Sequence, residues 1–209
     1  MPEAPPKKYS GQRIKRYPEL SCEIEEWRHL IEEYCKRMEM DVPYIYTERA
    51  LVGTFAAAVW RAGSISLEEY STTKGLRKGR GIRERPGRAD LWIMPKVMGK
   101  HPHGCIFEAK WIWLDIGRKS SLNDLPSKCK ELLRRAREDA KKVREAGKRL
   151  GLVFVIPYLS KRWKRDVEQH IERFISQLKK VDADIAWTFP SPKFTEGNHV
   201  YPGVAMLMR

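Results

Sequence analysis

A short run without polar residues is the feature that most constrains the fold of this chain. Residues 152–157 read LVFVIP, and Gly151 precedes them. A strand that is apolar at every position must be covered on both of its faces, which is typical of a central strand in a sheet packed between helices. The run therefore predicts a layered α/β domain with its sheet in the interior.

The rest of the chain supplies helices and strands for such layers. Apolar residues recur every three or four positions in residues 20–38, 125–143 and 163–178, and we expect helices there. Residues 47–62 predict one more helix, with Thr47 as its N-cap and Gly63 just beyond its end. The order of elements predicts a single α/β domain over residues 20–209, with a mixed central β-sheet flanked by α-helices. Strands are expected at residues 64–71, 89–94, 105–113, 184–189 and 204–208.

Two segments and one helix face complete this plan. Residues 1–19 carry Pro, Lys, Gly and Arg with few apolar side chains, and we expect a flexible basic arm. Residues 74–88 are rich in Gly, Arg and Lys and predict a loop. The apolar stripe of residues 20–38 either packs on the core or forms the face of a homodimer.

The net charge of the chain indicates which class of partner it binds. The formal net charge is +14, and an excess of this size favours a polyanionic partner, above all nucleic acid. Residues 1–11 lack the apolar core of a signal peptide, and the longest nearly apolar run, residues 51–60, is about half as long as a membrane-spanning helix requires. We therefore expect a cytoplasmic protein with no membrane partner.

Three ionisable residues stand in or beside the two predicted strands GRADLWI and CIFEAKW. Glu108 and Lys110 are two positions apart, so they share a face of their strand, and Asp90 lies beside Glu108 if the strands are neighbours. Two adjacent carboxylates repel each other, and a divalent cation relieves the repulsion. Oxygen ligands favour Mg²⁺, for which Mn²⁺ can substitute. The ammonium of Lys110 then lies near a metal-bound water or a phosphate.

Asp90 followed by Glu108-Ala109-Lys110 resembles the signature of the PD-(D/E)XK nuclease superfamily. The resemblance covers about residues 45–157 as a pattern, and Ala89 stands where the family name has Pro. It implies a restriction-endonuclease-like core and a Mg²⁺-dependent deoxyribonuclease, most simply an endonuclease. It also implies that Asp90 and Glu108 bind the metal and that Lys110 is catalytic. Glu48, on the predicted second helix, corresponds to a glutamate that joins the site in many members.

Each of these residues also has an ordinary structural interpretation. Asp90 can close a turn, and Glu108 with Lys110 can form a plain salt bridge at a sheet edge. A glutamate in the first turn of a helix, such as Glu48, is favoured by the helix dipole alone.

The basic loop is the predicted nucleic-acid contact, with DNA favoured over RNA. Its glycines would let it follow a phosphate backbone, and it leads into the strand that carries Asp90. The alternative functions are a non-catalytic nucleic-acid-binding module on the same fold and a basic adaptor for an acidic protein or an anionic lipid. The basic residues of the loop are Lys74, Arg77, Lys78, Arg80, Arg83, Arg85 and Arg88.

Overall fold

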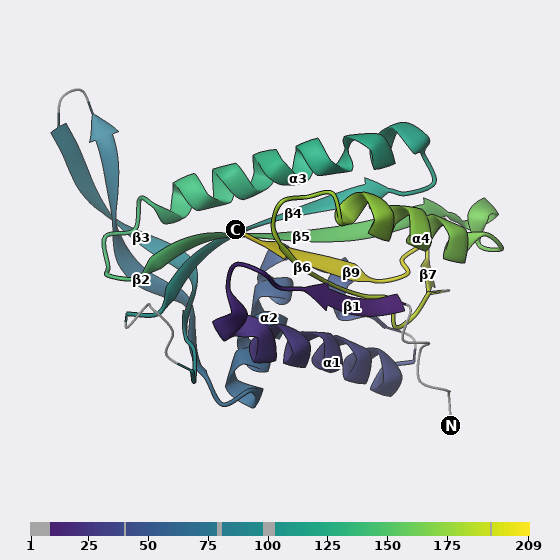
Figure 1. Ribbon diagram of the computed structural model, residues 1–209, viewed down its shortest axis with the longest axis horizontal. Coiled ribbons are helices and arrows are strands. Elements are labelled where there is room, and N and C mark those ends of the chain that lie inside the picture. The colour runs from purple at the N-terminus through teal and green to yellow at the C-terminus, as the bar shows by residue number, and fades with distance from the viewer. Residues whose placement is uncertain (1–8, 40, 79–80, 98–102, 193) are drawn as a thin grey trace.

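The computed structural model shows an α/β domain in which one mixed sheet lies between two layers of helices (Figure 1). It describes residues 9–39, 41–78, 81–97, 103–192 and 194–209, with the side chains of residues 76–78 and 81–83 left out. The helices are α1 (Ser21–Arg37), α2 (Glu48–Arg61), α3 (Lys119–Ala140) and α4 (Val167–Leu178), with short 3-10 turns at Pro18–Leu20, Pro43–Ile45 and Lys161–Trp163. The strands are β1 (Ser10–Arg13), β2 (Ile65–Lys78), β3 (Gly81–Met94), β4 (Cys105–Asp115), β5 (Lys148–Ser160), β6 (Asp184–Thr188), β7 (Thr195–Glu196), β8 (His199–Val200) and β9 (Val204–Met208).

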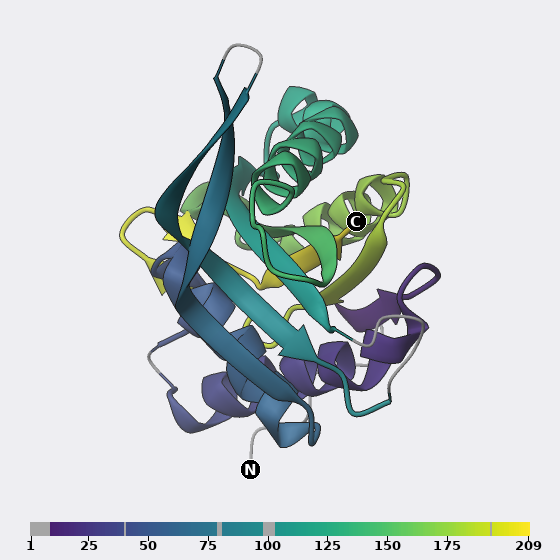
Figure 2. The same ribbon diagram turned by 90° about the vertical axis from the view of Figure 1, so that its left-hand side faces the viewer.

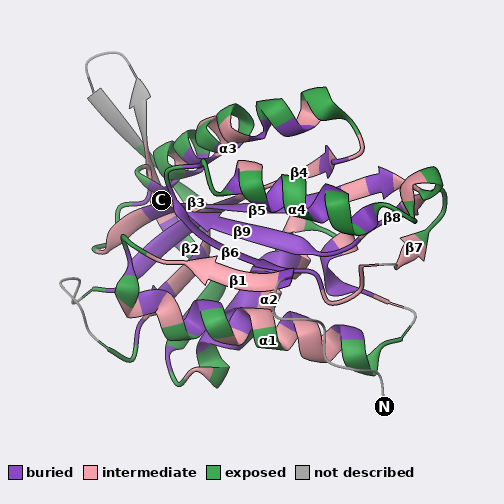
Figure 3. Ribbon diagram, turned by 45° about the vertical axis from the view of Figure 1, so that its right-hand side comes forward, coloured by how far each residue is buried: buried purple, intermediate pink, exposed green. Residues whose placement is uncertain are grey.

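The sheet has the order β1-β6-β9-β5-β4-β3-β2. Strands β4 and β5 are parallel and are joined by α3, whereas their other neighbours pair antiparallel. The apolar run that predicted a central strand lies in β5, where residues 152–157 are buried. Figure 3 shows the central strands as the most deeply buried part of the molecule. The predicted mixed sheet between helices is therefore confirmed.

Helices α1 and α2 cover one face of the sheet, and α3 and α4 cover the other (Figure 1). The apolar stripe of α1 packs on the core, since Leu20, Ile24, Trp27 and Ile31 have at most 1% of their surface exposed. The homodimer interpretation of that stripe is therefore wrong. None of the helices in the described part of the chain combines the length and the apolar character needed to cross a bilayer.

The ends of α2 follow the sequence closely. The Thr47 hydroxyl accepts a hydrogen bond from the Ala50 amide at 3.2 Å, so Thr47 is the predicted N-cap. Gly63 follows the helix with φ +83°, a left-handed conformation that glycine adopts without strain. This cap fixes where α2 begins, and so fixes the backbone position of Glu48, its first residue.

Two predictions about irregular segments are wrong. Residues 74–78 and 81–88 lie in strands and not in a loop, because β2 and β3 pair there and form a long hairpin that projects beside α3 (Figure 2). Within the predicted N-terminal arm, Ser10–Arg13 pair with β6, and the Tyr9 and Tyr17 side chains are buried. The domain therefore begins before residue 20, while residues 1–8 lie outside the described residues.

Candidate active site

The register of β3 and β4 brings two of the predicted carboxylates together. The ladder pairs Ile93 with Cys105 and Leu91 with Phe107 and ends there, so Asp90 and Glu108 are the first residues of the two strands past its end. The Asp90 carboxylate bonds the amide of Ala109, the residue next to Glu108, and its charge raises the pKa of Glu108. Asp90 and Glu108 are therefore neighbours at the end of the ladder.

The sheet forks at this position. The part of β3 that precedes Leu91 in the sequence does not pair with β4. It pairs only with β2. The Asp90 carboxylate takes over from the ladder, because its Oδ2 accepts a hydrogen bond from the Ala109 amide at 2.7 Å. Asp90 is therefore held at the point where the two strands separate.

The glutamate of the pair is deeply buried and has a lysine as its partner. Only 5% of Glu108 is exposed, and its Oε1 lies 2.6 Å from the Nζ of Lys74 on β2. Burial raises the pKa of Glu108; the hydrogen bond from Lys74 opposes this, and the charge of Asp90 adds to it. Lys74, one of the residues predicted to contact nucleic acid, is thus a direct partner of the candidate site.

The hairpin closes over this carboxylate on one side. The Gly75 amide donates to the Lys142 carbonyl at 2.8 Å, and the Arg144 amide donates to the Thr73 carbonyl at 3.0 Å. Next to these bonds the Thr72 hydroxyl donates to the Glu145 carboxylate. The segment after α3 thus pairs with β2 on either side of Lys74, the residue that bonds Glu108.

Lys110 shares the face of Glu108 and points toward α3. Its Nζ donates to the Ala109 carbonyl at 2.9 Å and lies 3.3 Å from Oδ2 of Asp139. Burial acts to raise the pKa of Asp139, but the hydrogen bond from Lys142 and the charge of Lys110 outweigh it and lower that pKa. Asp139 therefore stays ionised and fixes the Lys110 ammonium.

Glu48 is partly buried and belongs to the same electrostatic group. Burial is the main reason that its pKa is raised. The charge of Lys110 opposes the shift, whereas the charges of Asp90 and Glu108 increase it. The structure thus brings all four predicted catalytic residues into one neighbourhood, from α2, β3 and β4.

Sequence reasoning missed three members of this neighbourhood. Asp139 and Lys74 come from distant parts of the chain, and no spacing in the sequence connects them with Glu108. Glu69 lies opposite Asp90 in the β2–β3 register and is the described non-glycine residue with a positive φ, +47°. Such a conformation costs free energy and is found preferentially at functional sites, but only a structure reveals it.

The donor set fits Mg²⁺ or Mn²⁺ in one particular way. The described residues contain no group of three or more His, Cys, Asp or Glu side chains that could hold a metal ion. Mg²⁺, however, commonly keeps several waters and takes only one or two carboxylates from a protein. Oδ1 of Asp90 and Oε2 of Glu108 form no hydrogen bond with a described residue, so this pair suits a largely hydrated cation.

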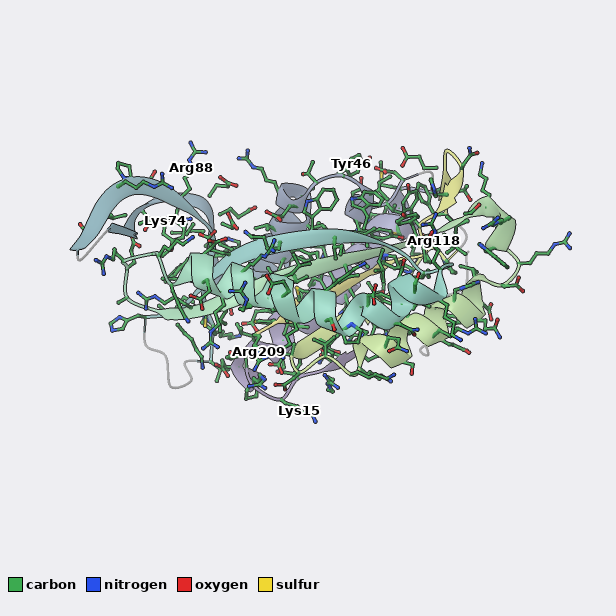
Figure 4. All side chains as sticks on the ribbon, turned by 90° about the horizontal axis from the view of Figure 1, so that it is seen from above. Lys15, Tyr46, Lys74, Arg88, Arg118 and Arg209 are labelled. Carbon is green, nitrogen blue, oxygen red and sulfur yellow. The ribbon has the colours of Figure 1, made fainter. Side chains whose placement is uncertain are left out.

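The basic residues of the hairpin are only partly described. Arg85 and Arg88 are exposed, and Arg88 lies 3.6 Å from Glu69. Figure 4 shows Lys74 and Arg88 toward the end of the molecule where the hairpin projects. The side chains of Arg77, Lys78 and Arg83, and the whole of Arg80, lie outside the described residues.

Comparison with known proteins finds no similar family model, no similar curated protein and no similar solved structure.

Proposed function

We propose that this chain is a metal-dependent phosphodiester hydrolase, a DNA endonuclease with a restriction-endonuclease-like core. The observation that carries the proposal is the position of Asp90 beside Glu108 at the fork of the sheet, with Lys110 two residues after Glu108 on β4. Neighbouring carboxylates, one of them buried, repel each other unless a cation accompanies them. Their clustering with a lysine and a further glutamate supports a catalytic function.

Each residue would have a distinct part in hydrolysis. Asp90 and Glu108 would hold Mg²⁺, which supplies a Lewis acid and an ionisable water when it is bound. Lys110, oriented by Asp139, would place its positive charge near the phosphate that gains negative charge in the transition state. Glu48 would accept a hydrogen bond from a water at the edge of the site.

A basic stripe on α3 would extend the nucleic-acid contact beyond the hairpin. Four of its cations follow the i, i+4, i+7, i+11 spacing of one helix face. They line a hollow of about 390 Å³ together with Arg209 and with Glu131 and Glu138, which pair with Arg134 and Lys141. Two of the four, Lys130 and Arg137, form no ion pair with a described residue and are free to bind phosphates. The stripe consists of Lys130, Arg134, Arg137 and Lys141.

The test is cleavage of supercoiled, linear and single-stranded DNA and of RNA, each with Mg²⁺, Mn²⁺ or EDTA. We expect metal-dependent cutting of DNA that is lost in Asp90→Asn, Glu108→Gln and Lys110→Met, with circular dichroism unchanged. Asp124→Asn is the matched control, since Asp124 is an exposed residue of α3 and its variant should cut normally. Full activity in all three site variants would reject this mechanism.

A non-catalytic nucleic-acid-binding module is the second candidate. It is favoured by the ion pairs Lys74–Glu108 and Lys110–Asp139, which already neutralise charge at the site. Calorimetry with Mg²⁺ and Mn²⁺, with and without DNA, separates the two functions. Intact DNA binding without any metal binding would favour the module. A homodimer stays a prediction, and analytical ultracentrifugation with and without DNA tests it.

A further inference from the structure

Lys74 is bonded to one oxygen of the Glu108 carboxylate, the group that would also have to bind the cation. Its Nζ is 2.6 Å from Oε1 of Glu108, and the two side chains are 17% and 6% exposed. The pair is therefore largely shielded from solvent, where a charge-assisted hydrogen bond is stronger than at the surface. A second cation brought to the same carboxylate would meet the repulsion of the ammonium.

Backbone hydrogen bonds on both sides of Lys74 hold this part of the hairpin in place. Lys74 lies on β2 between Thr73 and Gly75, whose backbone groups are bonded to Arg144 and Lys142. Gly87, on the adjacent strand, leaves room for the lysine stem, because a Cβ there would lie 3.0 Å from Cγ and Cδ of Lys74. The side chain therefore reaches Glu108 from a fixed backbone.

From these contacts we propose that Lys74 is a positioning residue of the candidate active site, one that holds the Glu108 carboxylate in place and competes with a divalent cation for it. The proposal rests on the proposed function, since it takes Glu108 to be a metal ligand. Binding of the cation would release the Lys74 ammonium from Glu108. Because Lys74 belongs to the hairpin, this exchange would connect metal binding with the segment that carries the predicted nucleic-acid contacts.

The experiment is a calorimetric titration of the nucleic-acid-free protein with Mn²⁺. We expect Lys74→Met to bind Mn²⁺ about tenfold more tightly than the wild type, the factor that corresponds to removing one charge-assisted competitor. Lys74→Arg keeps the competing charge and should bind like the wild type. Arg144→Met removes a cation from the segment that pairs with β2. The Arg144 side chain lies 3.4 Å from Glu84 and not beside Glu108, so this variant should also bind Mn²⁺ like the wild type.

Lys74→Gln is a second uncharged variant, included in case Lys74→Met does not fold. Its amide is a neutral hydrogen-bond donor for Glu108. It should also bind Mn²⁺ more tightly than the wild type, and at a fixed Mn²⁺ concentration its melting temperature should rise more. Equal or weaker Mn²⁺ binding by both uncharged variants would overturn the role of Lys74 and leave the metal site standing. Absence of Mn²⁺ binding from every protein, wild type included, would overturn the metal site and the role of Lys74 together.

Discussion

At the scale of single residues, the candidate site contains two ion pairs between buried or partly buried side chains. Glu108 is paired with Lys74, and Lys110 with Asp139. The sequence predicted that Asp90 and Glu108 lie together, because a strand's period of two and an antiparallel register determine which positions meet. It could not predict the partner charges, because their positions depend on how the hairpin and α3 pack in three dimensions.

A carboxylate outside the site gives a prediction about pH. Burial acts to raise the pKa of Asp41, but hydrogen bonds from the Tyr34 and Tyr46 hydroxyls and the Val42 amide outweigh it and lower that pKa. An acid with a lowered pKa binds fewer protons in the folded state, so its contribution is present above its ordinary pKa of 3.8 and is lost as the pH falls below that value.

Urea unfolding of the wild type and Asp41→Asn at pH 7 and at pH 3 measures this contribution. The wild type should be the more stable protein at pH 7, and the difference in unfolding free energy should shrink at pH 3. A difference that is the same at both pH values would contradict the assignment.

At the scale of elements, the segments that sequence patterns described poorly are those that other parts of the chain hold in place. Gly75, Pro86 and Gly87 interrupt the pattern of β2 and β3, yet the two strands pair at all three positions. Strand β1 has no alternation of apolar residues, and it forms because its backbone completes β6. By contrast, the Thr47 cap and the apolar run of β5 are local signals, and both predictions are confirmed.

The N-terminal segment depends on one buried carboxylate. Asp184, 2% exposed, accepts hydrogen bonds from the backbone amides of Lys15, Arg16 and Tyr17 at 2.8 to 3.1 Å. Asp184→Ala would leave these amides without that partner and should cost about 3 kcal/mol of unfolding free energy. Hydrogen exchange should show loss of protection at residues 10–17, and unchanged protection there would contradict this role.

The contact between α3 and β5 depends on a glycine. A Cβ at Gly151 would lie 2.6 Å from the Leu133 carbonyl and 3.0 Å from the Arg137 amide, both in the backbone of α3. Gly151→Ala should therefore push α3 away and cost about 1–3 kcal/mol by thermal or urea unfolding. Because Gly151 pairs with Glu108 in the parallel ladder, the displacement should also disturb the site.

Gly53→Ala is the matched control in α2. A Cβ there would meet only the Oε2 of the flexible Glu68 side chain, at 3.2 Å. Removing a glycine from a helix interior should raise the unfolding free energy by up to about 1 kcal/mol. If the two variants change stability equally, the close approach of α3 is not what Gly151 provides.

At the scale of the whole molecule, the excess positive charge should govern nucleic-acid affinity. The logarithm of the binding constant should fall linearly with the logarithm of salt concentration, with a slope of about −0.9 for each phosphate contact on duplex DNA. Replacing both Lys130 and Arg137 by Gln should make that slope shallower by about 1.8. Fluorescence anisotropy in EDTA measures it without cleavage, and an unchanged slope would remove the α3 stripe from the interface.

The most direct test of the central claim is an anomalous difference map from crystals of the protein soaked in Mn²⁺. The account predicts one Mn²⁺ peak between the carboxylates of Asp90 and Glu108, at the fork where β3 leaves β4. The peak should be absent from Glu108→Gln crystals treated in the same way. A well-ordered site without a peak in the soaked wild type, or Mn²⁺ bound only elsewhere, would contradict the claim that these two residues share a metal ion.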